Sequence, residues 1–185
     1  MKRFYVDASA FIRLAKIDRA DLLIDLGGDI YVPDAVSTEI QSEPERSRLN
    51  ELNKGRVIER GTPEWLRGDP DGIDRLERAA SHLGIDDVSE TGINGDVALL
   101  SLGMRDESAV IITDDKPLRK TCKTLGIPIS GSIGVVISAV KRGDLEPEEA
   151  KDSLVAMDEV GARLSARLLR KAEQLIDEAA EEREE

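Results

Sequence analysis

Short apolar runs alternate along the chain with longer segments in which apolar residues recur at helical spacing. The apolar runs predict strands at residues 4–6, 30–32, 57–58, 109–112 and 127–129. The amphipathic segments predict helices at residues 8–16, 21–26, 34–40, 45–53, 74–83, 97–104, 116–125 and 131–140. The strands lack strict alternation of polar and apolar residues, which is typical of parallel strands covered on both faces. The pattern therefore predicts an α/β fold with a short-stranded central parallel sheet.

The last part of the chain is helical in pattern. A helix is predicted to begin at Pro147, because proline is favoured at the first helical position, and the helical pattern continues to the end of the chain. The apolar residues that share one stripe of this segment are Leu164, Leu168, Leu175 and Ala179. The stripe predicts that a helical extension, residues 143–185, docks on the preceding domain, residues 1–142, or on a second copy of the chain in a homodimer.

Composition narrows the classes of protein that fit this pattern. Of the 185 residues, 40% are hydrophobic, which is enough for the core of one domain. The formal net charge of −12 argues against broad non-specific binding to nucleic acid or anionic membranes, although it leaves room for a local basic patch. Cys122 is the single cysteine and His82 the single histidine. An intramolecular disulfide and a multi-cysteine zinc site are therefore excluded, and a Ser-His-Asp triad is disfavoured.

The apolar runs also bear on the compartment. None of them approaches the roughly 20 residues that a membrane-spanning helix needs. A predicted strand follows directly after the first three residues, Met-Lys-Arg, without the layout of a signal peptide. We therefore expect a cytoplasmic protein that has no membrane partner.

Carboxylates follow the predicted strands at the edge where function gathers in open parallel sheets. Asp7 follows the first strand, Glu39 lies about a turn and a half into the helix after the second strand, and Asp114–Asp115 follows the strand at 109–112. Asp96 lies in the first turn of the helix that precedes that strand. At ~4 Å and an effective dielectric near 20, each like-charge pair costs ~4 kcal/mol, so such a cluster needs protonation or a bound cation. Oxygen ligands alone favour Mg²⁺ or Mn²⁺ over zinc, and such a metal activates water for attack on a phosphodiester.

Each of these acids also has a structural explanation. Asp7 is positioned to cap the helix that follows it, and Asp96 lies where the helix dipole favours a negative charge in any case. Glu39 alone fits an exposed helix face, and a turn or a cap explains one member of Asp114–Asp115. It is the joint placement of the acids at one sheet edge that favours the metal site.

Four stretches carry a resemblance to a known family, namely "VDASAFIRL", "VPDAVSTEI", "INGDVALLSL" and "VIITDDKPLRKTCKTLGIPISGSIGVV". In this order they resemble the PIN-domain family, in particular the VapC-type toxin ribonucleases and related archaeal PIN proteins predicted to bind nucleic acid. The resemblance spans about residues 3–140. It implies a doubly wound, three-layer α/β/α fold and cleavage of RNA with Mg²⁺ or Mn²⁺ held by three or four acids. It also implies the role of a toxin with an antitoxin protein as its partner.

The resemblance assigns roles to residues by match of motif. The implied catalytic acids are Asp7, Glu39, Asp96 and Asp115. The implied metal ligands are Asp7, Asp96, Asp114 and Asp115, and either member of the Asp114–Asp115 pair is the fourth acid. Ser9 and Thr113 are implied as hydroxyl neighbours of the metal. The third motif is often Gly-Glu in close relatives, whereas Gly95-Asp96 stands here, and the shorter acid reaches ~1.5 Å less far.

A basic stripe begins beside these acids. Its residues, spaced i, i+3, i+4 and i+7 on the predicted helix, are Lys116, Arg119, Lys120 and Lys123. Such a stripe is suited to hold RNA phosphates, while a solvated helix face is the alternative explanation. The sequence thus predicts a metal-dependent endoribonuclease, with a PIN-like nucleic-acid-binding or regulatory module of little or no catalysis as the alternative. A phosphatase of the aspartyl-phosphate type fits poorly, because it needs a second acid where Ser9 stands.

Overall fold

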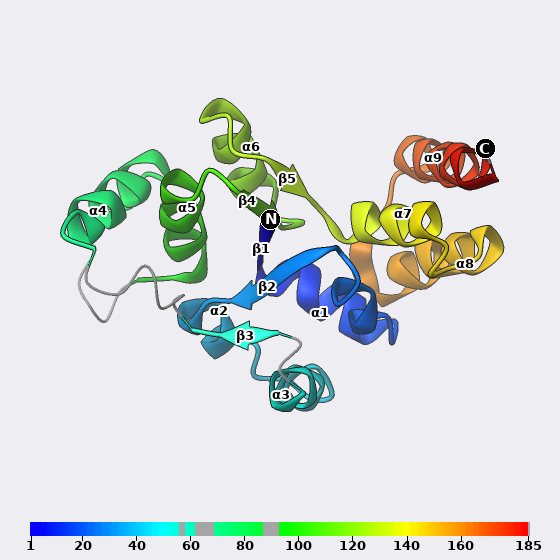
Figure 1. The fold of residues 1–185 in the computed structure, drawn as a ribbon, viewed down its shortest axis with the longest axis horizontal. Coiled ribbons are helices and arrows are strands. Elements are labelled where there is room, and N and C mark those ends of the chain that lie inside the picture. Colours follow the sequence, from blue (N-terminus) through cyan, green and yellow to red (C-terminus); the bar gives the residue numbers. More distant parts are fainter. Residues whose placement is uncertain (56–57, 62–68, 87–92, 185) are drawn as a thin grey trace.

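The computed structural model describes residues 1–55, 58–61, 69–86 and 93–184, which form a five-stranded sheet flanked by helices (Figure 1). The strands are β1 (Lys2–Val6), β2 (Gly28–Val32), β3 (Glu59–Arg60), β4 (Ala109–Ile112) and β5 (Ile129–Ser130). Their order is β3-β2-β1-β4-β5, and every neighbouring pair is parallel. The predicted parallel α/β fold is confirmed, with β1 at the centre of the sheet.

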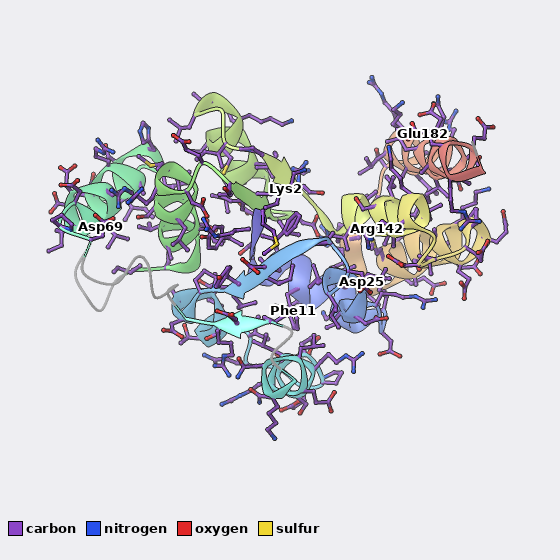
Figure 2. The ribbon with its side chains drawn as sticks, viewed as in Figure 1. Lys2, Phe11, Asp25, Asp69, Arg142 and Glu182 are labelled. Atoms are coloured by element: carbon purple, nitrogen blue, oxygen red, sulfur yellow. The ribbon has the colours of Figure 1, made fainter. Side chains whose placement is uncertain are left out.

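Helices cover both faces of this sheet, as the three-layer prediction requires. They are α1 (Ala8–Lys16), α2 (Asp34–Glu39), α3 (Glu45–Lys54), α4 (Gly72–His82), α5 (Gly95–Arg105), α6 (Lys116–Thr124), α7 (Ser132–Arg142), α8 (Pro147–Met157) and α9 (Ala166–Glu184). Helix α1 packs with α3 and α7, whereas α5 packs with α4 and α6. Phe11, which is completely buried, lies near the middle of the molecule, and Glu182 lies at its periphery on α9 (Figure 2). Within the described ranges, no helix combines the length and the apolar character needed to cross a membrane.

Four expected elements differ from the structure, among them the last strand, β5, which lies at Ile129–Ser130 instead of 127–129. The segment predicted as a helix at 21–26 contains only a short 3-10 turn (Ala20–Leu23), and the chain then turns at Gly27, whose φ is 79°, into β2. The third strand lies at Glu59–Arg60 instead of 57–58, and residue 57 is outside the described residues. The helical pattern after Pro147 is broken by a π-type turn (Asp158–Ala162) in which Gly161 has a φ of 98°.

The predicted apolar stripe of the C-terminal helix is confirmed only in part, since Ala179 is buried as expected. Leu164 precedes α9 and packs against the core from outside this helix, and Leu168, one turn before Ala172, is 44% exposed. The face that packs on α7 and α8 carries Ala172, Ile176 and Ala179, all of which are buried. The division into a domain of residues 1–142 and an extension of residues 143–185 stays a prediction.

Candidate metal centre

The first acid of the predicted set, Asp7, directly follows β1 and is only 4% exposed. It occupies the N-cap position of α1, but its side chain makes no capping hydrogen bond, so the capping explanation is wrong. Instead its Oδ2 accepts hydrogen bonds from Thr113 Oγ1 at 2.7 Å and from Ser9 Oγ. The pairing of Val6 with Ile112 between β1 and β4 places Asp7 beside Thr113. A buried carboxylate is thus held at the carboxyl edge of the sheet by two hydroxyls.

The same two hydroxyls orient the dipeptide that follows β4. Thr113 Oγ1 accepts a hydrogen bond of 3.0 Å from the backbone N–H of Asp115. Ser9 Oγ accepts one of 3.0 Å from the backbone N–H of Asp114. Ser9 and Thr113 therefore lie between the first acid and the last two, and they fix the backbone from which those acids project.

Glu39 and Asp96 come from two different helices that meet at this edge. Glu39 is the last residue of α2, and its Oε1 accepts a hydrogen bond of 2.8 Å from the N–H of Gly95, the first residue of α5. Asn94 caps the same helix, since its Oδ1 accepts from the N–H of Val97 at 2.9 Å. The start of α5 therefore carries Asp96 and also receives the negative charge of Glu39, as the helix dipole favours.

The pKa of Asp96 indicates that the other acids lie near its carboxyl group. Its pKa is raised to about 6, first by burial and then by the negative charges of Asp7, Asp115 and Glu39. An opposite charge nearby would instead lower the pKa of a carboxyl. Negative charge therefore accumulates around Asp96, and no cationic side chain of the described residues is among the causes that set its pKa. Asp7, Glu39, Asp96 and Asp115 form what we call the acid cluster.

The carboxylates of Asp114 and Asp115 have different partners. Asp114 Oδ1 accepts a hydrogen bond of 2.9 Å from the N–H of Ser132 at the start of α7. Its Oδ2 lies 2.6 Å from a guanidinium nitrogen of Arg13, a contact that is electrostatic because it lacks hydrogen-bond geometry. Asp115 Oδ1 caps α6 by accepting from the N–H of Leu118 at 2.8 Å, while its charge also acts on Asp96. Asp115 thus belongs to the acid cluster, and the charge of Asp114 is compensated by Arg13.

The donor atoms of the cluster fit a hard divalent cation. They are carboxylate oxygens supported by hydroxyls, which Mg²⁺ and Mn²⁺ prefer. Such a cation would neutralise the negative charge that gathers around Asp96. Within the described part of the chain, however, no three acidic, histidine or cysteine side chains are arranged as a ready-made metal site. The acids therefore have to close further around a cation before they can share it.

The predicted basic stripe divides into two parts. Lys116, Lys120 and Lys123 are exposed on α6 and line a hollow of about 400 Å³ together with Arg119. Arg119 is only half-buried, but its Nη1 donates to the carbonyl oxygens of Thr113 at 2.7 Å and of Ser130 at 2.9 Å. Arg119 therefore ties the ends of β4 and β5 together, and the three lysines are the side chains that face solvent beside Asp115.

Sequence reasoning missed Gly95 and Ser132 as parts of this arrangement. A Cβ at position 95 would lie 2.8 Å from Glu39 Oε1, so the close approach of that carboxylate requires glycine. The glycine directly before Asp96 was the available signal, because glycine often marks a close approach. No comparable signal pointed to the backbone N–H of Ser132 as the partner of Asp114.

The chain matches a known protein family over most of its length. Residues 4–178 match the family model described as PIN domain, a range that includes β2 to β5, the last three residues of β1, the four acids and most of α9. No curated protein matches the chain.

Proposed function

The chain belongs to the PIN-domain family, whose members are generally nucleases, and from this premise we propose that it is a metal-dependent endoribonuclease. The observation that carries the proposal is the convergence of four acids, Asp7, Glu39, Asp96 and Asp115, at the carboxyl edge of one sheet. Their proximity agrees with the raised pKa of Asp96, which arises from burial and from the charges of the other three. Such a concentration of charge destabilises the fold unless it binds a cation.

Each acid has a role in this proposal. Asp7, Asp96 and Asp115 would hold Mg²⁺ or Mn²⁺, which supplies an activated water and stabilises the leaving oxygen of the phosphodiester. Glu39 is exposed, and the hydrogen bond from Gly95 fixes one of its oxygens, so the other is free to orient a water. Asp96 gives up its proton above about pH 6, which completes the negative charge of the site. Asp114 is left out of the ligand set because Arg13 and Ser132 engage both of its oxygens.

The solvent-facing lysines of α6 complete the proposal. Lys116, Lys120 and Lys123 would hold phosphates of the RNA beside Asp115. Electrostatic attraction to phosphates supplies most of the affinity for single strands and positions the strand without reading its sequence. In a chain with a net charge of −12, this local patch gives the strand a defined approach.

The test is cleavage of single-stranded RNA by the purified protein. We expect cleavage with Mn²⁺ and none with EDTA, and a loss of at least about a hundredfold for Asp7→Asn and for Asp96→Asn. The control is Asp152→Asn, an exposed acid of α8 that leaves the site untouched. If every RNA stays intact with Mn²⁺ and Asp7→Asn leaves metal affinity unchanged, the alternative is supported, namely a nucleic-acid-binding module with little or no catalysis.

The toxin role, the antitoxin protein, the homodimer and the cytoplasmic location stay predictions that rest on the sequence. The toxin role has a direct test. Induced expression of the wild-type chain should arrest growth, and expression of Asp96→Asn to the same level should not. Growth that continues with active wild-type nuclease contradicts the toxin role and leaves the endoribonuclease proposal standing.

A further inference from the structure

A second polar hollow lies next to the acid cluster, at the carboxyl ends of β2 and β3. It has a volume of about 390 Å³ and lies between the end of α2, the first half of α3 and Arg60, the last residue of β3. The polar side chains that line it are Ser37, Thr38, Gln41, Arg46, Asn50 and Arg60. None of its lining residues is acidic, which sets it apart from most of the surface of a chain with a net charge of −12.

Arg60 is held in this hollow by neutral partners. Its Nη1 donates to Asn50 Oδ1 at 3.0 Å, and its Nη2 donates to Ser37 Oγ at 3.3 Å. These two bonds orient the guanidinium without cancelling its charge. A guanidinium has five N–H donors, so three of them remain for a ligand.

Arg46, in the first turns of α3, supplies a second positive charge. Among the described residues its side chain has no ion pair and no hydrogen bond. The acid it acts on is Glu43, whose lowered pKa arises chiefly from hydrogen bonds with Ser47 and least from Arg46. Arg46 and Arg60 therefore present two positive charges to one hollow, and neither charge is paired with a carboxylate of the residues that the structure describes.

The position of the hollow relates it to the acid cluster. Thr38 lines the hollow, and the next residue along α2 is Glu39. The sheet order places β2 and β3 on one side of β1 and places β4, which leads into α6, on the other. Figure 1 shows α3 and α6 on opposite sides of β1. A strand that crosses the carboxyl edge of the sheet would therefore meet the lysines of α6, then the acid cluster, then Arg46 and Arg60.

We propose that Arg46 and Arg60 bind a backbone phosphate of the RNA strand, on the side of the acid cluster opposite to the lysines of α6. The proposal rests on the proposed function, since it takes RNA as the substrate. Arginine forks match phosphate oxygens in pairs, and the neutral side chains of Ser37, Gln41 and Asn50 are suited to sugar and phosphate contacts. With an anchor on each side, the phosphodiester over the acids is held in place from both directions.

The test is binding of a short fluorescein-labelled oligouridylate to the full chain in EDTA, measured by anisotropy over a range of salt concentrations. We expect Arg46→Gln and Arg60→Gln each to weaken binding about tenfold and to lower the slope of log affinity against log salt by about 0.7. The control, Arg167→Gln, removes the same charge from an exposed position on α9 and should change neither quantity.

Three outcomes of the oligouridylate titrations would overturn the anchor. The first is unchanged binding in both variants, and the second is an equal loss in Arg167→Gln, which would reveal an effect of net charge alone. The third is a loss confined to Arg60→Gln, which the hydrogen bonds of Arg60 to Ser37 and Asn50 would explain structurally. Titration with inorganic phosphate at constant ionic strength distinguishes a site for free phosphate from a site for the RNA backbone. Arginine-dependent binding of free phosphate, without arginine-dependent binding of the oligouridylate, also contradicts the proposal.

Binding in EDTA separates this proposal from the proposed function. If the wild-type chain cleaves RNA with Mn²⁺ while both arginine variants bind the oligouridylate normally, only the anchor is wrong. If no RNA is cleaved but both variants lose affinity as expected, the anchor stands and the nuclease proposal fails.

Discussion

Glu39 Oε1 accepts a hydrogen bond of 2.8 Å from the backbone N–H of Gly95, and this bond joins the end of α2 to the start of α5. The next residue, Asp96, is the acid on which the other charges of the cluster act. The bond therefore sets the spacing between the second and third acids. It depends on the missing side chain at position 95, where a Cβ would lie 2.8 Å from Glu39 Oε1 and 3.1 Å from Val36 Cγ2.

Gly95→Ala is predicted to displace Glu39. The added methyl group has to push the carboxylate or the start of α5 aside, which we expect to lower the free energy of unfolding by about 1–2 kcal/mol. Because Glu39 moves relative to Asp96, RNA cleavage with Mn²⁺ should fall more than the folded fraction does. Urea unfolding and initial cleavage rates, taken under the same buffer conditions, measure the two effects.

Gly72→Ala is the matched control for that variant. Gly72 is also the first residue of a helix, α4, but among the described residues a Cβ there would meet only Asp69 Cβ, at 4.0 Å. We expect cleavage to be unchanged and stability to stay constant or to rise by about 0.5 kcal/mol, because alanine restricts the unfolded chain. Equal behaviour of the two alanine variants would show that the contact with Glu39 does not matter.

Substitutions of Asp114 and Asp115 are predicted to have different effects, one mainly on stability and the other mainly on RNA cleavage. Asp115→Asn keeps an oxygen that can cap α6, since asparagine and aspartate are equally good caps, but it removes one charge from the acid cluster. Stability should change by less than about 0.5 kcal/mol, while cleavage falls at least tenfold, on the order expected for a lost metal ligand. Asp114→Asn removes the charge that faces Arg13, so it should cost about 1–3 kcal/mol of stability. At equal folded fraction, Asp114→Asn should retain more activity, and the reverse ranking would exchange the roles of the two acids.

Asp96 is predicted to make the stability of the metal-free protein depend on pH. Its pKa is raised from 3.8 to about 6, so between these values the native state keeps a proton that the unfolded state has lost. The free energy of unfolding contributed by this group should therefore fall as the pH rises from about 4 to about 6, and stay low above that. Asp96→Asn stays uncharged and should be more stable than the wild type above pH 6, by about 1–3 kcal/mol, and equal to it near pH 4. Urea unfolding in EDTA across this range measures the difference.

The experiment on Asp96 includes two further measurements, one with Mn²⁺ and one on a control variant. Mn²⁺ at neutral pH should stabilise the wild type, because it neutralises the cluster, and should stabilise Asp96→Asn much less. Asp152→Asn, from the exposed face of α8, should follow the wild type at every pH. Parallel pH profiles of the wild type and Asp96→Asn would show that the acids around Asp96 do not interact as described.

The strand pattern could be read from the sequence because β1, β2 and β4 are buried on both faces. Their apolar runs are therefore unbroken, and parallel strands then place Asp7 and Thr113 at one edge. The segment at 21–26 misled because its apolar residues are buried by a 3-10 turn and a loop, which need no helical period. The stripe of the last helix was right at Ala179 and wrong at Leu168, because the apolar pattern does not say where along α9 the packing on α7 and α8 begins.

The residues of the acid cluster could be predicted from the sequence more easily than the contacts that these residues make. Acids at strand ends follow from topology alone. Which acid keeps its charge uncompensated depends on side chains far apart in the sequence, as in the contact of Asp114 with Arg13. The two hydrogen bonds from Arg119 to the carbonyls of Thr113 and Ser130 could not be predicted either. The spacing of a basic stripe does not indicate which of its side chains turn inward.

Arg119 and Lys120 are adjacent cations. We predict that substituting Arg119 lowers the stability of the protein, whereas substituting Lys120 weakens its binding to RNA. Arg119→Gln loses two hydrogen bonds from a charged group and should cost about 1–3 kcal/mol of stability. Lys120→Gln, on the exposed face of α6, should leave stability within about 0.5 kcal/mol and lower the salt slope of oligouridylate binding by about 0.7. Unfolding and anisotropy measurements on both variants test this, and an unchanged slope in Lys120→Gln would remove that lysine from the RNA path.

The C-terminal helix provides the last prediction, because its apolar residues differ in burial. Ile176 is completely buried, so Ile176→Ala should cost about 2–5 kcal/mol. Leu168 is 44% exposed, and Leu168→Ala should cost less than about 0.5 kcal/mol. Because α9 packs on α7 and α8 of its own chain, the urea midpoint should not depend on protein concentration. A midpoint that rises with concentration, and rises less in Ile176→Ala, would instead show that this helix is stabilised by a second copy, as the predicted homodimer allows.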